Sequence, residues 1–230
     1  MTAADARASL SAFRLADSFL PVGGNTVSYG LEQFVASGHV EDADDLRDVL
    51  DSYLRRQLGP CESVALRAAH TAGDDLDTVE RVDETLLTRT LPAEFRESAT
   101  KAGRRLLEVE AETSDDPVVA AYEERVATTA APGMYPVALG LVASQRGIPA
   151  DEACLLHGHA FLTDMLGAAQ RLLSLGHLAA QRLLDDLADV LVDVIDANAD
   201  RPLDRMEPFA PLVDVHAMEH ERAERRLFVS

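Results

Sequence analysis

Apolar residues recur at intervals of three and four along most of this sequence. In "DADDLRDVLDSYLRRQL", residues 42–58, the apolar positions are 46, 49, 50, 53, 54 and 58. Residues spaced in this way share one face of an α-helix. Alternating apolar and polar runs are scarce, and no Asn-Gly hairpin turn occurs. The sequence therefore predicts an all-α fold, a single-domain bundle of roughly eight to ten helices over residues 1–230.

Helix ends are marked by capping residues and by breakers. Asp42 or Asp44 is suited to cap the helix of the segment above, because a side-chain oxygen there accepts hydrogen bonds from unpaired backbone N–H groups. Gly59-Pro60 is predicted to end that helix, and a second helix is expected over Glu62–Thr71. The segment from 149 to 176 is long and apolar on most faces, which predicts a central, buried helix.

The charge of the chain excludes several classes of partner. Forty acidic residues face 21 basic ones, a formal net charge of −19, and Lys101 is the sole lysine. An anionic phosphate backbone or membrane surface would be repelled, so neither nucleic acid nor a membrane is expected as a partner. Acidity spread along the whole chain indicates adaptation to high salt, because molar salt has a Debye length of about 3 Å and screens the repulsion.

No targeting or membrane segment is apparent. The first 13 residues, "MTAADARASLSAF", carry acids and have no apolar core of a signal peptide. No apolar run reaches the roughly 20 residues that span a bilayer. Two cysteines, Cys61 and Cys154, make no disulfide framework, so a cytoplasmic location is expected.

The stretch "FLPVGGNTVSYGLEQF", residues 19–34, combines a Pro-Gly-Gly corner with the start of a helical pattern. Loops of this kind cradle phosphates in some proteins, and the backbone N–H groups of Gly23 and Gly24 are suited to an anion. However, the P-loop pattern GxxxxGK[ST] is absent. The favoured interpretation is a tight turn into a helix, with Ser28 as its cap and Glu32 near its start.

No catalytic group stands out. No GxSxG elbow is present, and both cysteines lie in apolar helical contexts where a thiol behaves as a small hydrophobic group. His157 and His159 are two apart and so lie on different faces of a helix. His216 and His220 are four apart, share a face and, with a nearby glutamate, are weak candidates for a Ni²⁺ or Zn²⁺ site. The chain is therefore predicted not to be an enzyme.

Five blocks along the chain together resemble one family. They are "LADSFLPVGGNTVSYGLE", "RESATKAGRRLL", "GMYPVALGLVASQRGI", "AQRLLSLGHLAAQRLL" and the ending "HERAERRLFVS". In this order, and on a helical chain of this length, they are similar to the urease accessory protein UreF family. The chain departs from the usual family residues at five positions: Asn25, Val27, Met134, Ser174 and His177.

The resemblance implies a non-enzymatic urease maturation factor. Proteins of this family are all-α and dimerise, bind the accessory protein UreD (also called UreH), and with it recruit the GTPase UreG. The assembly delivers Ni²⁺ to apo-urease. The resemblance thus implies a homodimer with no firmly bound cofactor, the GTP lying on UreG and the Ni²⁺ being handled by the complex. The alternative is a chaperone that binds nickel directly through His216 and His220.

The resemblance also assigns candidate site residues. The tail from about 221 to 230 is expected to be flexible and to bind partners, and Glu32 with the Gly23-Gly24 loop is expected to face the GTPase. Two polar residues, Arg171 and Gln181, are expected to line a polar path through the helical core. The predicted partner-binding residues are Arg226, Leu227, Phe228, Ser230, Glu32, Gly23 and Gly24.

Overall fold

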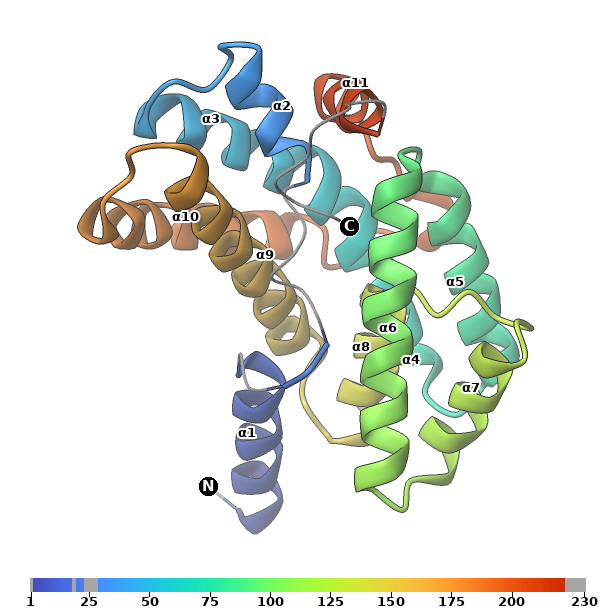
Figure 1. The fold of residues 1–230 in the computed structure, drawn as a ribbon. Coiled ribbons are helices and arrows are strands. Elements are labelled where there is room, and N and C mark those ends of the chain that lie inside the picture. The colour runs from blue at the N-terminus through green and yellow to red at the C-terminus, as the bar shows by residue number, and fades with distance from the viewer. Residues whose placement is uncertain (1, 18–19, 23–28, 222–230) are drawn as a thin grey trace.

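The computed structural model describes residues 2–17, 20–22 and 29–221, and these form an all-α fold, as predicted (Figure 1). The elements are α1 (Ala3–Ala16), α2 (Leu31–Ala36), α3 (Ala43–Tyr53), η2 (Leu54–Glu62), α4 (Ser63–Ala72), α5 (Leu76–Arg89), α6 (Ala93–Thr113), α7 (Pro117–Ala127), α8 (Tyr135–Gln145), α9 (Ala150–Leu172), α10 (His177–Ala197), η3 (Leu203–Arg205) and α11 (Pro211–His220).

Helices α4 and α8 form the centre of the fold, and α8 is buried along most of its length. The two backbones come close because Gly140 on α8 has no side chain: a Cβ atom there would lie 3.1 Å from the carbonyl carbon of Leu66 and 3.2 Å from its Cα. Gly103 on α6 likewise faces the backbone of Gly133 and Met134, at the start of α8. Small residues therefore set the spacing of the three inner helices.

The other helices surround this centre (Figure 1). Helices α5 and α7 lie on one side beside α6, and α9 and α10 lie on the other. Helices α2, α3 and α11 gather at one end of the molecule, while α1 lies at the other end and packs against α9. A buried carboxylate, Glu110 on α6, holds α1 and α8 through ion pairs with Arg14 and Arg146.

Two acidic residues cap helices as N-cap chemistry requires. Asp42 accepts hydrogen bonds from the backbone N–H groups of Asp44 at 2.9 Å and Asp45 at 3.1 Å, so it is the cap that the sequence proposed for α3. Asp116 does the same for α7. The long, buried α9 matches the prediction for the segment from 149 to 176.

The predicted helix end at Gly59-Pro60 is wrong. The chain runs from α3 through η2 into α4 without a break, because η2 is a π-helical segment of nine residues. In an α-helix the ring of Pro60 would clash with the carbonyl of residue 56, four positions earlier. The wider i→i+5 turn removes that conflict, and the N–H of Ser63 bonds the carbonyl of Leu58.

The carbonyls freed by the π-helix find partners in a distant segment. The N–H of Phe209 donates to the carbonyl of Arg56 at 2.9 Å, and the N–H of Glu207 donates to that of Pro60 at 3.1 Å. Gly59 lets α10 approach, since a Cβ there would lie 2.9 Å from Nδ2 of Asn198. Tertiary contacts, which the local sequence does not show, therefore satisfy the backbone at this position.

A buried carboxylate anchors the start of α8. Asp83 on α5 accepts hydrogen bonds from the hydroxyl of Tyr122 at 2.6 Å and from the N–H groups of Gly133 and Met134 at 2.6 and 2.9 Å. Burial raises the pKa of Asp83 to about 6, although the three hydrogen bonds oppose that rise. The carboxylate thus holds the two residues that precede α8, about 50 positions away in the sequence.

Both cysteines are buried, as their apolar contexts predicted. Burial raises the pKa of the Cys154 thiol to about 12 and raises that of Cys61 as well. Among the described residues, none of the helices combines the length and apolar character needed to cross a membrane.

Candidate functional site

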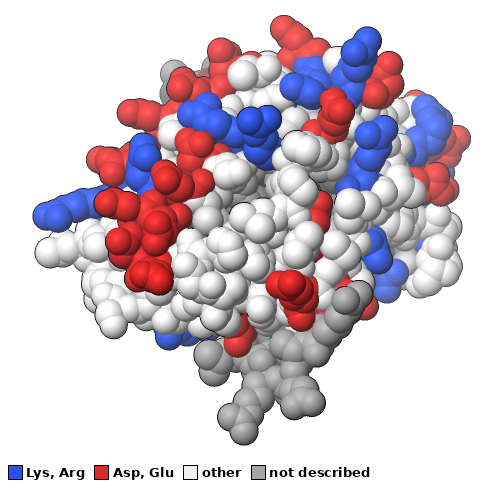
Figure 2. Space-filling view, turned by 90° about the horizontal axis from the view of Figure 1, so that it is seen from above, with Lys and Arg blue, Asp and Glu red and all other residues white. Residues whose placement is uncertain are grey.

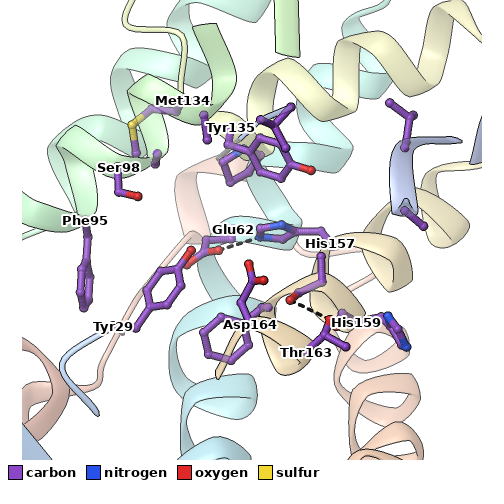
Figure 3. A pocket seen from close by; sticks show the side chains of 18 of the residues that line it. Tyr29, Glu62, Phe95, Ser98, Met134, Tyr135, His157, His159, Thr163 and Asp164 are labelled. Atoms are coloured by element: carbon purple, nitrogen blue, oxygen red, sulfur yellow. Dashed lines mark hydrogen bonds and ion pairs between the residues drawn. The ribbon is translucent and has the colours of Figure 1, made fainter. Parts of the chain in front are cut away.

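A cavity of about 480 Å³ lies between α6, α8, α9 and the end of η2 (Figure 3). Its polar centre is the pair Glu62 and His157, whose Oε2 and Nε2 atoms are 2.7 Å apart. Glu62 is the last residue of η2 and His157 lies on α9, so the π-helical segment determines where this carboxylate points. The ring of Tyr135, at the start of α8, lies 5.8 Å from that of His157.

A second carboxylate faces this pair. Figure 3 shows the side chain of Asp164, which like His157 lies on α9, pointing toward Glu62 and His157. Partial burial raises the pKa of Asp164 to about 6, and the positive charge of Arg171 opposes that rise. Asp164 is therefore a carboxylate whose charged form is destabilised in a partly enclosed space.

Aromatic side chains form another wall of the cavity. The Tyr29 ring lies 5.2 Å from that of Phe161 and 5.4 Å from that of Phe95, in tilted or edge-on arrangements that are favourable for aromatic pairs. Burial raises the pKa of Tyr135 to about 12 and raises that of Tyr29 as well. Both hydroxyls are therefore protonated at neutral pH.

The described lining of the cavity is acidic and aromatic. Among the described residues that line it, carboxylates are present and lysine and arginine are not. Such a lining disfavours anions. The two cysteines of the chain are not among the described residues that line it, and the hydroxyls of Tyr29 and Tyr135 are held protonated.

A second polar cluster joins α2, α6 and α11. His220, buried at the end of α11, has Nδ1 at 2.8 Å from Oε2 of Glu94 and Nε2 at 3.1 Å from Oε2 of Glu32. The next residue, Glu221, accepts a hydrogen bond from the N–H of Glu94 at 3.1 Å. Both ring nitrogens of His220 therefore lie within hydrogen-bond distance of a glutamate oxygen.

Several predicted site residues lie outside the described residues. These are Gly23, Gly24, Arg226, Leu227, Phe228 and Ser230, together with the proposed cap Ser28 and the family departures Asn25 and Val27. Glu32 is described and lies in the first turn of α2, as predicted, where it contacts His220. The N-cap of α2 is Gly30, at a positive φ of 79° that favours glycine.

The expectation that Arg171 and Gln181 lie in the helical core is corrected by the structure. Both side chains are exposed, Arg171 in the last turn of α9 and Gln181 near the start of α10. Their apolar neighbours in the sequence belong to the other faces of these helices. Of the remaining family departures, Met134 is buried and lines the cavity, while Ser174 and His177 are exposed.

The pairing of His216 with His220 as a metal site is also corrected. The four-residue spacing does place both on the buried face of α11, but each ring nitrogen of His220 already faces a glutamate oxygen. Among the described residues, no group of three or more His, Cys, Asp or Glu side chains is arranged to hold a metal ion. His157 and His159 lie on different faces as expected, one buried and one exposed.

Sequence reasoning missed the residues that form the cavity. Glu62 was expected only as the start of a helix, and its partner His157 lies 95 positions away. Asp164 is one acid among forty in the chain. The one local signal was the Gly59-Pro60 pair inside an apolar helical pattern, because π-helical turns are frequent at functional sites.

Comparison with known proteins identifies the family of the chain. A family model described as UreF matches residues 40–188. The urease accessory protein UreF of Yersinia enterocolitica is 32% identical over 214 residues, 92% of this chain and 93% of that protein. This chain belongs to the UreF family. UreF proteins of Yersinia pseudotuberculosis and Brucella canis are similar at 31% and 30% identity, the latter, named UreF 2, over 96% of this chain and 91% of its own length. The resemblance drawn from the five sequence blocks is confirmed.

Proposed function

We propose that this UreF chain is a non-enzymatic urease maturation factor. It forms a complex with UreD/UreH and the GTPase UreG and regulates GTP-dependent nickel insertion into apo-urease. The observation that carries the proposal is the family match over more than nine-tenths of the chain to proteins named urease accessory protein. In this proposal GTP binds to UreG, the complex handles Ni²⁺, and the chain acts as a homodimer in the cytoplasm.

Exposed apolar side chains on α11 support a role in protein binding. The inner face of α11 packs on the core, while Leu212 and Val215 on its outer face are exposed, together with Phe209 just before it, which is 67% exposed. We call Phe209, Leu212 and Val215 the α11 patch. Exposed apolar groups that are contiguous mark interaction sites more often than isolated ones do. Helix α1 also exposes two apolar residues, Leu10 and Phe13, one turn apart.

The charge distribution at this end of the molecule fits the same role. Figure 2 views the end that carries α2, α3 and α11: acidic and basic side chains occupy the margin, and a broad uncharged area lies in the middle. A chain of net charge −19 therefore still offers neutral surface for a partner. Interface centres are depleted of charged residues, so this distribution suits protein binding.

The cluster around His220 links the two stretches that the family resemblance singled out. Helix α2 follows the Gly23-Gly24 loop and α11 precedes the C-terminal tail, and Glu32, Glu94 and His220 connect them. Helices α2 and α11, which adjoin these stretches in the sequence, therefore meet at the same end of the fold. This arrangement supports a composite surface made by the loop, the tail and the α11 patch.

The proposal is tested by assembly in molar KCl with the UreD-like and UreG-like proteins of the same source. Light scattering after gel filtration should show a heteromer for the wild type, and Phe228→Ala and the double variant Phe209→Ala/Leu212→Ala should weaken it. Leu178→Ala, which removes an exposed leucine (76% exposed) on α10, is the matched control. A wild-type chain that associates with neither partner would refute the proposal, and full assembly of Phe228→Ala would refute the role of the tail.

A further inference from the structure

One carboxylate in the cavity has no direct partner. Glu62 lies 2.7 Å from His157, but the carboxylate of Asp164 forms no hydrogen bond or ion pair with another described residue (Figure 3). The opposing charge of Arg171 acts on Asp164 from outside the cavity, since Arg171 is exposed in the last turn of α9. Because a partly buried charge is costly unless it is paired, Asp164 would stabilise a cation bound beside it.

An aromatic wall faces the same space. Burial raises the pKa of Tyr29, and the charges of Glu62 and Asp164 add to that rise, so the Tyr29 hydroxyl lies near both carboxylates. The ring of Tyr29 packs against Phe161 and Phe95, which line the cavity as well. An aromatic face attracts a cation, and the attraction is larger where water is excluded. Carboxylates and aromatic rings in one cavity therefore favour an organic cation as its ligand.

A buried hydroxyl beside this wall is unsatisfied too. The ring of Tyr53 lies 4.8 Å from that of Phe161, and its hydroxyl has no hydrogen-bond partner among the described residues, although Tyr53 is only 1% exposed. Burial raises the pKa of Tyr53, and the charge of Glu62 adds to that rise, which places the hydroxyl near the polar centre of the cavity. Buried polar atoms without a partner are rare. The Asp164 carboxylate and the Tyr53 hydroxyl are thus two groups whose hydrogen-bonding capacity the described residues leave unused.

The cavity has the size and the lining for a cation that carries an apolar stem. Its volume of about 480 Å³ lies within the range of roughly 300–1,000 Å³ that is typical of ligand pockets. The apolar side chains of Leu15, Leu86 and Met134 line it together with the polar groups. The methylene stem of an arginine packs on apolar surface, while its planar guanidinium group pairs with carboxylates and stacks on aromatic rings. An arginine side chain therefore fits this lining better than a compact ammonium group does.

The cavity opens between α1 and α9, next to exposed apolar residues. Asp17 at the end of α1 and the α9 residues His159 and Thr163 line the cavity and are exposed. Leu10 and Phe13 on α1 are exposed as well. Leu10, Phe13 and Asp17 are three and four positions apart, so they lie on one face of the chain at α1. An acidic, aromatic cavity and an apolar helix face are therefore neighbours on the surface.

We propose that this cavity and the exposed face of α1 form a docking site for a basic segment of a partner protein, which inserts one arginine side chain into the cavity. The guanidinium group lies against Asp164, Glu62 and the ring of Tyr29, and apolar residues of the segment cover Leu10 and Phe13. Arginine is among the residues that are enriched as anchors of protein interfaces. Molar salt screens long-range attraction, so recognition comes from contacts inside the cavity.

The test uses the full chain labelled with ¹³C at its methionine methyl groups, in molar KCl. Met134 lines the cavity, whereas Met206, buried after η3, is not among its described lining residues and serves as the internal reference. The probes are N-acetyl-arginine methylamide, its neutral isostere N-acetyl-citrulline methylamide, and the capped peptide Ala-Leu-Arg-Leu-Ala. We expect the arginine probe to shift the Met134 signal saturably and the citrulline probe to bind at least about tenfold more weakly, because it lacks charge-assisted hydrogen bonds. The peptide should bind about tenfold more tightly than the arginine probe, because its leucines reach α1.

Matched variants separate the cavity from the general acidity of the chain. Asp164→Asn keeps the shape of the side chain and should weaken binding of the arginine probe at least about tenfold. Asp189→Asn makes the same charge change at an exposed position of α10 and should bind as the wild type does. Leu10→Ala/Phe13→Ala should remove the advantage of the peptide, and Leu178→Ala, at an exposed position of α10, should keep it. The thermal midpoint of each variant is measured alongside to show that it is folded.

Each of three results would overturn the proposal: no saturable shift of Met134 with the arginine probe, equal binding of the citrulline probe, or wild-type binding by Asp164→Asn. A peptide that binds no more tightly than the arginine probe would show a site for small free cations and would overturn the docking of a protein segment. The chain's own arginines near its end are tested with Arg222→Gln/Arg225→Gln/Arg226→Gln. A tenfold gain in probe affinity there would make the tail the occupant in place of a partner and would overturn the proposal. These measurements need neither UreD/UreH nor UreG, so their failure is distinguishable from a failure of the proposed function.

Discussion

The contact of Gly140 with Leu66 predicts that adding one methyl group will destabilise the protein. In Gly140→Ala the new Cβ would lie against the backbone of α4, 3.1 and 3.2 Å from two carbon atoms of Leu66 and closer still to its carbonyl oxygen. A side chain in this place can rotate away, but a helix backbone has to move as a unit. The change would separate α4 from α8 and disturb Glu62, just before α4, and Tyr135, at the start of α8, which both line the cavity.

The expected magnitude follows from two opposing terms. Overpacking a filled core costs about 1–3 kcal/mol, and we take the upper end because the obstacle is backbone. Alanine gains about 1 kcal/mol over glycine inside a helix. The net loss is about 2 kcal/mol, which for a chain of this size lowers the thermal midpoint by about 4–8 °C.

A matched variant isolates the contact. Gly167 lies inside α9 and has open space where its Cβ would be, so Gly167→Ala should gain about 0.5–1 kcal/mol from helix propensity alone. Thermal and urea unfolding of both variants in molar KCl gives the comparison, with opposite signs expected. If Gly140→Ala melts at or above the wild-type temperature, the close approach of α4 and α8 described here is wrong.

Three further outcomes are expected. Glu110→Gln should lose about 2–3 kcal/mol in urea unfolding, because the buried carboxylate that holds Arg14 and Arg146 is replaced by a neutral group; an unchanged midpoint would contradict its role in fixing α1. Asp164→Asn should stabilise the chain by about 1–2 kcal/mol at pH 7, which is less than the full pKa shift corresponds to because Asp164 is partly exposed to solvent. Because the pKa of Asp164 is raised to about 6, the folded wild type binds this proton more tightly than the unfolded chain does, and its free energy of unfolding falls as pH rises from about 4 through 6. The gain in the variant should therefore disappear at pH 4. A gain independent of pH would refute this cause. Cys61 and Cys154 should react with a thiol reagent only after unfolding, because both are buried. Rapid reaction of the native chain would show that they are accessible.

The helical class and most helix positions were predictable because they depend on local spacing. The periodicity of α3, its cap Asp42, and the buried α9 needed no information beyond neighbouring residues. The continuation of the helix through Gly59-Pro60 was not predictable, since the groups that satisfy its carbonyls come from residues about 150 positions later. Local rules for proline describe an isolated segment, and here tertiary hydrogen bonds replaced the ones that proline removes.

The candidate sites were predictable only in part for the same reason. Glu32 and His220 were each singled out from sequence, but their contact, between residues 188 positions apart, was not. His216 was paired with His220 because their spacing places both on one face of a helix, but that spacing says nothing of what packs against the face. In a chain with forty acids, a buried carboxylate such as Asp83 cannot be told from a solvated one by composition.

The number of residues in the π-helical segment η2 also determines how α4 is rotated about its axis relative to α3. Each residue of an α-helix turns the chain by about 100°, so one residue more or less rotates everything that follows by that angle. If Pro60 keeps the remaining residues in the wider winding, deleting a single residue from η2 would rotate the whole of α4 with respect to α3. Glu62 would then point away from His157, and the apolar stripe of α4 would turn away from α8. Homologous chains can therefore change length elsewhere in their loops, but within residues 54–62 the residue count is coupled to the position of a carboxylate on which the cavity depends.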